Sequence, residues 1–98
     1  MSRSRKWFAT LAWTIEFDER AKRDLAKLDK PVQKRIRRYL QDRIAPAVDP
    51  KSFGHGLTRN LSNLWRFRVG DHRILCNIEF DRLIVLVVAV GHRSTVYD

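Results

Sequence analysis

Three arginines cluster in the segment LWRFRVGDHRILCNI, which has the pattern of a β-hairpin. Its residues alternate between apolar and polar on both sides of Gly70 and Asp71, the expected two-residue turn. Directly opposed residues of an antiparallel pair share a face, and this turn places Arg68 opposite Arg73. Arg66, Arg68 and Arg73 are therefore predicted to project from one face of the hairpin. The residues predicted for the opposite, core-facing side are Trp65, Phe67, Ile74 and Cys76.

This arrangement predicts a site for a phosphate group. Two cations directly opposite one another on neighbouring strands repel each other unless an anion lies between them. The planar guanidinium group matches phosphate oxygens with two hydrogen bonds and stays charged at every physiological pH. The alternative is that Arg66, Arg68 and Arg73 are ordinary exposed strand residues that pair with carboxylates from elsewhere in the chain.

A second group of polar residues follows the apolar run RLIVLVVAV in the segment GHRSTVYD. Arg93 stands just beyond this predicted strand, where its side chain could join the other three arginines. His92 is the candidate for proton transfer, because an unperturbed imidazole titrates near pH 6.5. His92, Arg93 and Tyr97 could also be ordinary surface residues, since each type taken alone is more often found there than in catalysis.

The composition indicates one folded domain with an anionic partner. The chain has 98 residues, of which 44% are hydrophobic and 32% charged, so residues 1–98 are expected to form a single domain. Its net charge of +9 favours nucleic acid, an acidic protein segment or an anionic membrane surface as partner. Cys76 is the only cysteine, which excludes an intrachain disulfide, and its apolar strand indicates a core residue.

No apolar run approaches the roughly 20 residues that a transmembrane helix needs, so a cytoplasmic protein is expected. Residues 1–10 have the composition of a flexible basic leader.

The order of elements predicted from periodicity is β-α-α-β-β-β. Residues 12–17 alternate as a strand, Asp18 is a candidate N-cap for a helix ending near Asp29, and Pro31 fits the first turn of a second helix. We expect the two helices to form an antiparallel hairpin on the sheet, and residues 45–63 to form one long loop. The last three strands are LWRFRV, HRILCNIE and RLIVLVVAV, the last being a central strand covered on both faces.

The polar face of the second predicted helix is strongly basic. It carries five cations and a single acid, namely Lys34, Arg35, Arg37, Arg38, Arg43 and Asp42. Like charges at helical spacing are mildly unfavourable, so this face is either simply solvated or a contact surface for something acidic.

Taken together, the segments FDERAKRDLAKLDK, GLTRNLSNLWRFRVGDHRILCNI and LIVLVVAVGHRSTVY resemble the RelE/ParE superfamily of bacterial type II toxins. The resemblance implies an α+β fold, with a mainly antiparallel sheet and two N-terminal helices packed on it. It also implies a RelB-like antitoxin as partner, and contact with operator DNA only through the toxin–antitoxin complex. In the RelE branch it implies cleavage of messenger RNA in the ribosomal A site, without metal or cofactor. There the 2′-hydroxyl attacks the adjacent phosphate and leaves a 2′,3′-cyclic phosphate.

By the same resemblance, Arg66, Arg68 and Arg73 stabilise the phosphate and the transition state, and Arg93 stabilises the phosphorane or the leaving oxygen. Tyr97 would stack on a base or help the 2′-hydroxyl lose its proton. Arg68 is a poor proton acceptor because a guanidinium group stays protonated at every physiological pH, which favours His92 for that role. Lys34, Arg35, Arg38 and Arg59 are the candidates for contact with RNA of the ribosome, although the helix residues could equally contact the antitoxin.

Two other functions remain open at this level. A ParE-like toxin would use the same fold to inhibit DNA gyrase by binding, without nuclease chemistry, although an inhibitor has no need for a set of phosphate-stabilising residues. A non-enzymatic RNA-binding module would need exposed aromatic residues for base stacking. Trp13, Phe17, Trp65 and Phe67 fall instead on positions predicted to be in the core.

Overall fold

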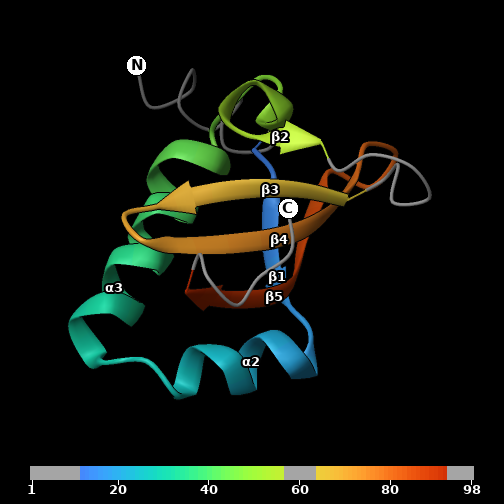
Figure 1. The fold of residues 1–98 in the computed structure, drawn as a ribbon. Helices are drawn as coiled ribbons and strands as arrows, with labels where there is room; N and C mark the ends of the chain where they lie inside the picture. Colours follow the sequence, from blue (N-terminus) through green and yellow to red (C-terminus); the bar gives the residue numbers. More distant parts are fainter. Residues whose placement is uncertain (1–11, 57–63, 93–98) are drawn as a thin grey trace, which may run out of the picture.

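The computed structural model describes residues 12–56 and 64–92, and it shows an α+β fold with one five-stranded sheet (Figure 1). The elements are β1 (Thr14–Phe17), α2 (Glu19–Ala26), α3 (Lys30–Tyr39), the π-helix η1 (Leu40–Ile44), the 3₁₀ turn η2 (Pro50–Phe53), β2 (His55–Gly56), β3 (Leu64–Val69), β4 (His72–Glu79) and β5 (Ile84–His92). The strands lie in the order β1-β5-β4-β3-β2. The predicted fold class, with two helices before a series of strands, is confirmed.

The sheet is mainly antiparallel. The strand predicted to be central, β5, is an interior strand paired on both sides, whereas β4 stands in the middle of the order. β5 pairs in parallel with β1 and antiparallel with β4, while β4 pairs with β3 and β3 with the short β2. One irregularity interrupts the β4–β5 ladder, because Leu75 pairs with Ala89 whereas Cys76 pairs with Val87. Val88 is thus the extra residue of a β-bulge in β5, which reverses the inward and outward alternation of the residues that follow it.

Both helices bury one apolar stripe against the same face of the sheet. Asp18 caps α2 as predicted, since its carboxylate accepts a hydrogen bond of 2.8 Å from the backbone N–H of Ala21. The core that forms between helices and sheet includes Ala21, Leu25, Ile36, Leu40, Ile44, Phe67, Ile74, Cys76, Val85, Val87 and Val90. Among the described residues, no helix is long and apolar enough to cross a membrane.

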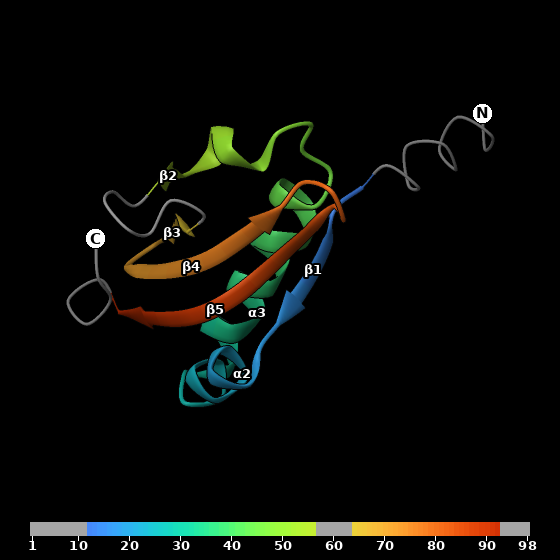
Figure 2. The same cartoon turned by 90° about the vertical axis from the view of Figure 1, so that its right-hand side faces the viewer.

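The predicted antiparallel helix hairpin is wrong. Figures 1 and 2 together show α2 running crosswise to α3. Each helix follows a different part of the sheet, since α2 packs along β5 and α3 lies beside β3. Tertiary packing on a strongly twisted sheet therefore determines the helix directions, and the short connection between the helices does not.

Two further expectations are corrected. The second helix changes at Leu40 into a π-helical turn, in which the N–H of Ala45 donates to the carbonyl of Leu40 at 2.8 Å. The predicted loop 45–63 contains η2 and the two-residue strand β2, so the order β-α-α-β-β-β omits one short strand; residues 57–63 lie outside the described part. Trp65 holds this segment, because its indole N–H donates to the carbonyl of Lys51 at 3.1 Å.

We expect Asp24→Ala to destabilise the fold by about 1–3 kcal/mol, because it leaves a partly buried N–H group without an acceptor. β1 ends at Phe17, opposite Val87, so it supplies no partner for the rest of β5. The carboxylate of Asp24 accepts from the backbone N–H of Val90 at 3.0 Å instead. Urea denaturation measures the loss. Asp24→Asn retains an oxygen acceptor and should cost less, whereas equal stability of the alanine variant and wild type would contradict this role.

Candidate active site

The β3–β4 hairpin has the predicted turn and the predicted register. Gly70 has a φ of +60°, and Leu83 is the only non-glycine residue of the described part with a positive φ. A two-residue turn in which only the first residue has a positive φ is typically of type II′, and this type matches the twist of antiparallel strands. Val69 pairs with His72, and the next pair along the ladder is Arg68 with Arg73.

Gly70→Ala is expected to destabilise the hairpin by about 1–2 kcal/mol, since an L-residue pays this cost in the left-handed region. The new Cβ would also lie 3.1 Å from a guanidinium nitrogen of Arg35 on α3. Thermal denaturation measures the effect. Asp71→Ala is the matched control at the neighbouring exposed position, which lacks positive φ. A Gly70→Ala protein as stable as this control would contradict the strain argument.

Arg66, Arg68 and Arg73 share one face of the hairpin, opposite to the helices, and are called the arginine face below. Arg68 is exposed, whereas Arg66 and Arg73 are half-buried and contact neighbouring groups. A small apolar cluster lies on this same side of the sheet, with Leu75 and Ala89 buried and with Leu64 and Val88 packed against them. This apolar surface lowers the local dielectric constant, which strengthens the interaction of the guanidinium groups with an anion.

The register separates His92 from the arginine face. His92 pairs with His72, which in turn pairs with the core-facing residue Val69, so these three share one side of the sheet. Gly91 is the residue opposite Arg73. The rings of His72 and His92 meet edge to face, with 5.8 Å between their centroids. His92 thus lies at the end of β5 on the side opposite to the three arginines. Arg59, Arg93 and Tyr97, the other candidates, lie outside the described residues.

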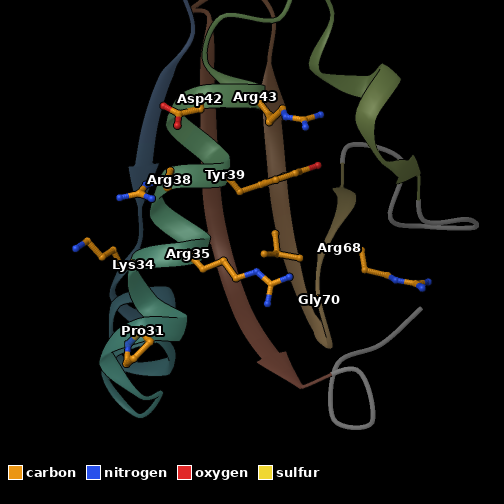
Figure 3. Close-up of a pocket in the computed structure, with 10 residues that line it drawn as sticks. Pro31, Lys34, Arg35, Arg38, Tyr39, Asp42, Arg43, Arg68 and Gly70 are labelled. Carbon is orange, nitrogen blue, oxygen red and sulfur yellow. The ribbon is translucent and has the colours of Figure 1, made fainter.

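A groove of about 590 Å³ separates α3 and η1 from the end of β3 (Figure 3). Its walls are formed by Pro31, Lys34, Arg35, Arg38, Tyr39, Asp42, Arg43, Arg68, Val69 and Gly70. Figure 3 shows that Arg35, Tyr39 and Arg43 point toward the strands, whereas Lys34 and Arg38 point to the other side of the helix. The basic helix face predicted from the sequence is therefore divided into two parts with different surroundings.

The groove carries an excess of positive charge that the surrounding protein does not balance. In the ranges 12–56 and 64–92, none of its five cations forms an ion pair, and Asp42 is its only acid. Burial raises the pKa of the half-buried Tyr39 hydroxyl, and the positive charge of Arg43 partly opposes this shift. Tyr39 therefore remains a hydrogen-bond donor at neutral pH.

Tyr39 and Arg43 were not predicted as site residues, although their spacing from Arg35 could have signalled a common face. Cys76 behaves as predicted, since it is fully buried and burial raises the pKa of its thiol, which keeps it from acting as a nucleophile. Within the described ranges, no three or more His, Cys, Asp or Glu side chains are grouped as metal ligands would be.

Comparison with known proteins places the chain in a toxin family. The family model for the ParE toxin of the type II toxin–antitoxin system parDE matches residues 15–97. Toxin RelG of Mycobacterium tuberculosis is 26% identical over 87 residues, which cover 89% of this chain and 98% of RelG.

Solved structures of RelE toxins share the fold. The toxin–antitoxin complex RelBE2 from M. tuberculosis contains a chain that is 27% identical, with a TM-score of 0.77 over 84% of this chain and 99% of that one. A mutant of E. coli toxin RelE in the free state gives a TM-score of 0.67 at 20% identity, with 83% of each chain covered. The chain belongs to the ParE toxin family of type II toxin–antitoxin systems, within the RelE/ParE superfamily.

Proposed function

We propose that this toxin is a ribosome-dependent endonuclease that cleaves messenger RNA in the A site, with the arginine face as its phosphate-binding surface. The observation that carries the proposal is the direct pairing of Arg68 with Arg73, with Arg66 on the same face of the sheet. The resemblance of the chain to Toxin RelG supports a RelE-like activity. Guanidinium groups fixed on paired strands are preorganised for charge that develops on a phosphate during reaction.

The reaction follows from the chemistry of RNA. The 2′-oxygen attacks the adjacent phosphorus, and the bond between that phosphorus and the 5′-oxygen of the next nucleotide breaks. The products are a 2′,3′-cyclic phosphate and a 5′-hydroxyl end. The arginine face stabilises the negative charge of the phosphorane, and its members cannot accept the proton of the 2′-hydroxyl. Tyr97 is the proposed proton-transfer group, because His92, the other candidate from the sequence, lies on the side of the sheet opposite to the arginine face. Arg93 is proposed to stabilise the phosphorane or the leaving oxygen.

The proposed partners fit this activity. Solved relatives are toxin–antitoxin complexes, such as the archaeal RelE–RelB complex from Pyrococcus horikoshii, so we propose a RelB-like antitoxin for this chain. Operator DNA would be contacted only through that complex. The cations Lys34, Arg38 and Arg59 are proposed to contact RNA of the ribosome in the cytoplasm, with an affinity that falls steeply as salt rises. Arg35, the fourth cation predicted for this contact, points toward the strands instead (Figure 3).

Primer extension on a defined message in a purified translation system tests the activity. Wild-type protein should produce breaks within the A-site codon when ribosomes are present and an intact message when they are absent. Breaks that appear equally without ribosomes would contradict the ribosome dependence. An intact message under both conditions would contradict the nuclease itself.

The match to the ParE family model favours a second candidate, inhibition of DNA gyrase by binding. In that case the arginine face would be a docking surface without chemistry. Plasmid supercoiling by purified gyrase separates the two functions. The nuclease proposal predicts unchanged supercoiling at toxin concentrations that cleave the message, whereas inhibition of gyrase together with an intact message would support the second candidate.

A further inference from the structure

The groove between α3 and β3 is continuous with the arginine face through one residue. Arg68 lies on the same face of β3 as Arg66 and also lines this groove. An anionic chain that binds the arginine face can therefore cross the edge of β3 at Arg68 and enter the groove. β2 pairs only with Trp65 and Arg66, so no strand of the described residues pairs with the part of β3 next to the hairpin turn.

The helical wall of the groove presents a row of hydrogen-bond donors. Arg35, Tyr39 and Arg43 follow one another at i, i+4 and i+8 along α3 and the π-helical turn η1. Figure 3 shows all three directed toward the strands, with the Tyr39 hydroxyl outermost on its side chain, while Asp42 points away from them. Such a row matches a ligand that carries several acceptor oxygens along its length.

Charge and size agree with this geometry. Arg35, Arg43 and Arg68 line the groove without an ion pair from the described part of the chain, so their mutual repulsion is relieved when an anion binds. Lys34 and Arg38 also border the groove but point to the other side of the helix (Figure 3). Its volume of about 590 Å³ is within the range typical of ligand sites. A phosphodiester backbone fits better than an acidic peptide, because the adjoining arginine face already has the pairing expected for phosphate.

We propose that the α3–β3 groove binds the segment of single-stranded messenger RNA next to the cleaved phosphate. Arg35 and Arg43 contact successive backbone phosphates, and the Tyr39 hydroxyl donates to an oxygen between them. The inference rests on the proposed function, because it assigns the groove to the same RNA strand. It adds a strand-binding subsite on α3 that acts before and apart from the chemical step.

Fluorescence anisotropy with a short labelled single-stranded RNA, without ribosomes, tests the groove directly. Arg35→Gln and Arg43→Gln should each weaken binding by about tenfold and make the salt dependence shallower by about 0.7 in log–log slope, the value for one lost contact to a single strand. Tyr39→Phe should weaken binding by about threefold while keeping the slope, since it removes one neutral hydrogen bond. Arg23→Gln, an exposed cation on α2, is the matched control and should change neither quantity beyond the loss of general charge.

Two results would overturn the inference. The first is RNA binding by Arg35→Gln and Arg43→Gln that equals the binding of Arg23→Gln. The second is a preference of the groove for another anion. Labelled oligoglutamate would then bind more tightly than the RNA, and Arg35→Gln and Arg43→Gln would weaken its binding. Neither result bears on cleavage at the arginine face, which primer extension measures separately, so failure of the groove and failure of the nuclease are distinguishable.

Discussion

Arg73→Ala is expected to lower the rate of message cleavage by about a hundred- to a thousandfold, the usual cost of removing one preorganised donor from a developing oxyanion. Arg73 lies on β4, held between β3 and β5, and its half-buried side chain stands beside the apolar cluster around Leu75. Arg68 is more exposed, so water can replace part of its effect. The loss should therefore be larger for Arg73 than for Arg68.

Single-turnover cleavage on programmed ribosomes measures this loss. Arg23→Ala serves as the matched control, because it removes one exposed positive charge on α2, outside the hairpin. Arg73→Lys should recover only part of the rate, since an ammonium group lacks the planar fork of the guanidinium. If the Arg73→Ala protein folds normally and cleaves at the wild-type rate, this result would contradict a role of the arginine face in the reaction.

Phe67→Ala is expected to destabilise the fold by about 3–5 kcal/mol, the range for truncating a fully buried aromatic residue. Phe67 is 0% exposed and stands on β3 between Arg66 and Arg68. Its ring lies 6.5 Å from the ring of Tyr39, so it joins the strand of the arginine face to the helix of the groove. Since small domains are stable by about 5–15 kcal/mol in total, this loss is a large fraction of the whole.

Urea denaturation followed by tryptophan fluorescence measures the effect. Phe80→Ala is the control, because Phe80 is 46% exposed and should cost much less. Phe67→Leu keeps most of the apolar contact and provides a folded protein if the alanine variant does not fold. Equal costs for Phe67→Ala and Phe80→Ala would contradict the central place of Phe67 in the core.

The hairpin could be predicted because its signals are local. The alternation around Gly70 and Asp71 determines both the turn and the face on which the three hairpin arginines lie, and the structure has that register. The direction of α2 depends on contacts between residues far apart in the sequence, such as the hydrogen bond from Val90 to Asp24. The strand β2 is likewise held near β3 by Trp65 and Lys51, which no periodicity reveals.

The position of His92 shows how one residue can change a predicted site. Without the bulge at Val88, strict alternation from Val85 and Val87 would direct His92 to the same side as Arg73. The extra residue shifts the alternation, and Val90 and His92 face the helix side instead. The bulge itself has no signal in an apolar run such as RLIVLVVAV. The groove was also beyond prediction, because Arg35 and Arg68 line the same groove only after α3 packs beside β3.

Phosphoryl transfer on the arginine face is tested most directly with a message that carries a single 2′-deoxynucleotide on the 5′ side of the cleaved phosphate. In the purified translation system, wild-type protein should leave this phosphate intact while cleaving an otherwise identical all-ribose message. The same substitution one codon away should have no effect. Cleavage that persists at the 2′-deoxy position would contradict attack by the 2′-hydroxyl, and with it the proposed role of Arg66, Arg68 and Arg73.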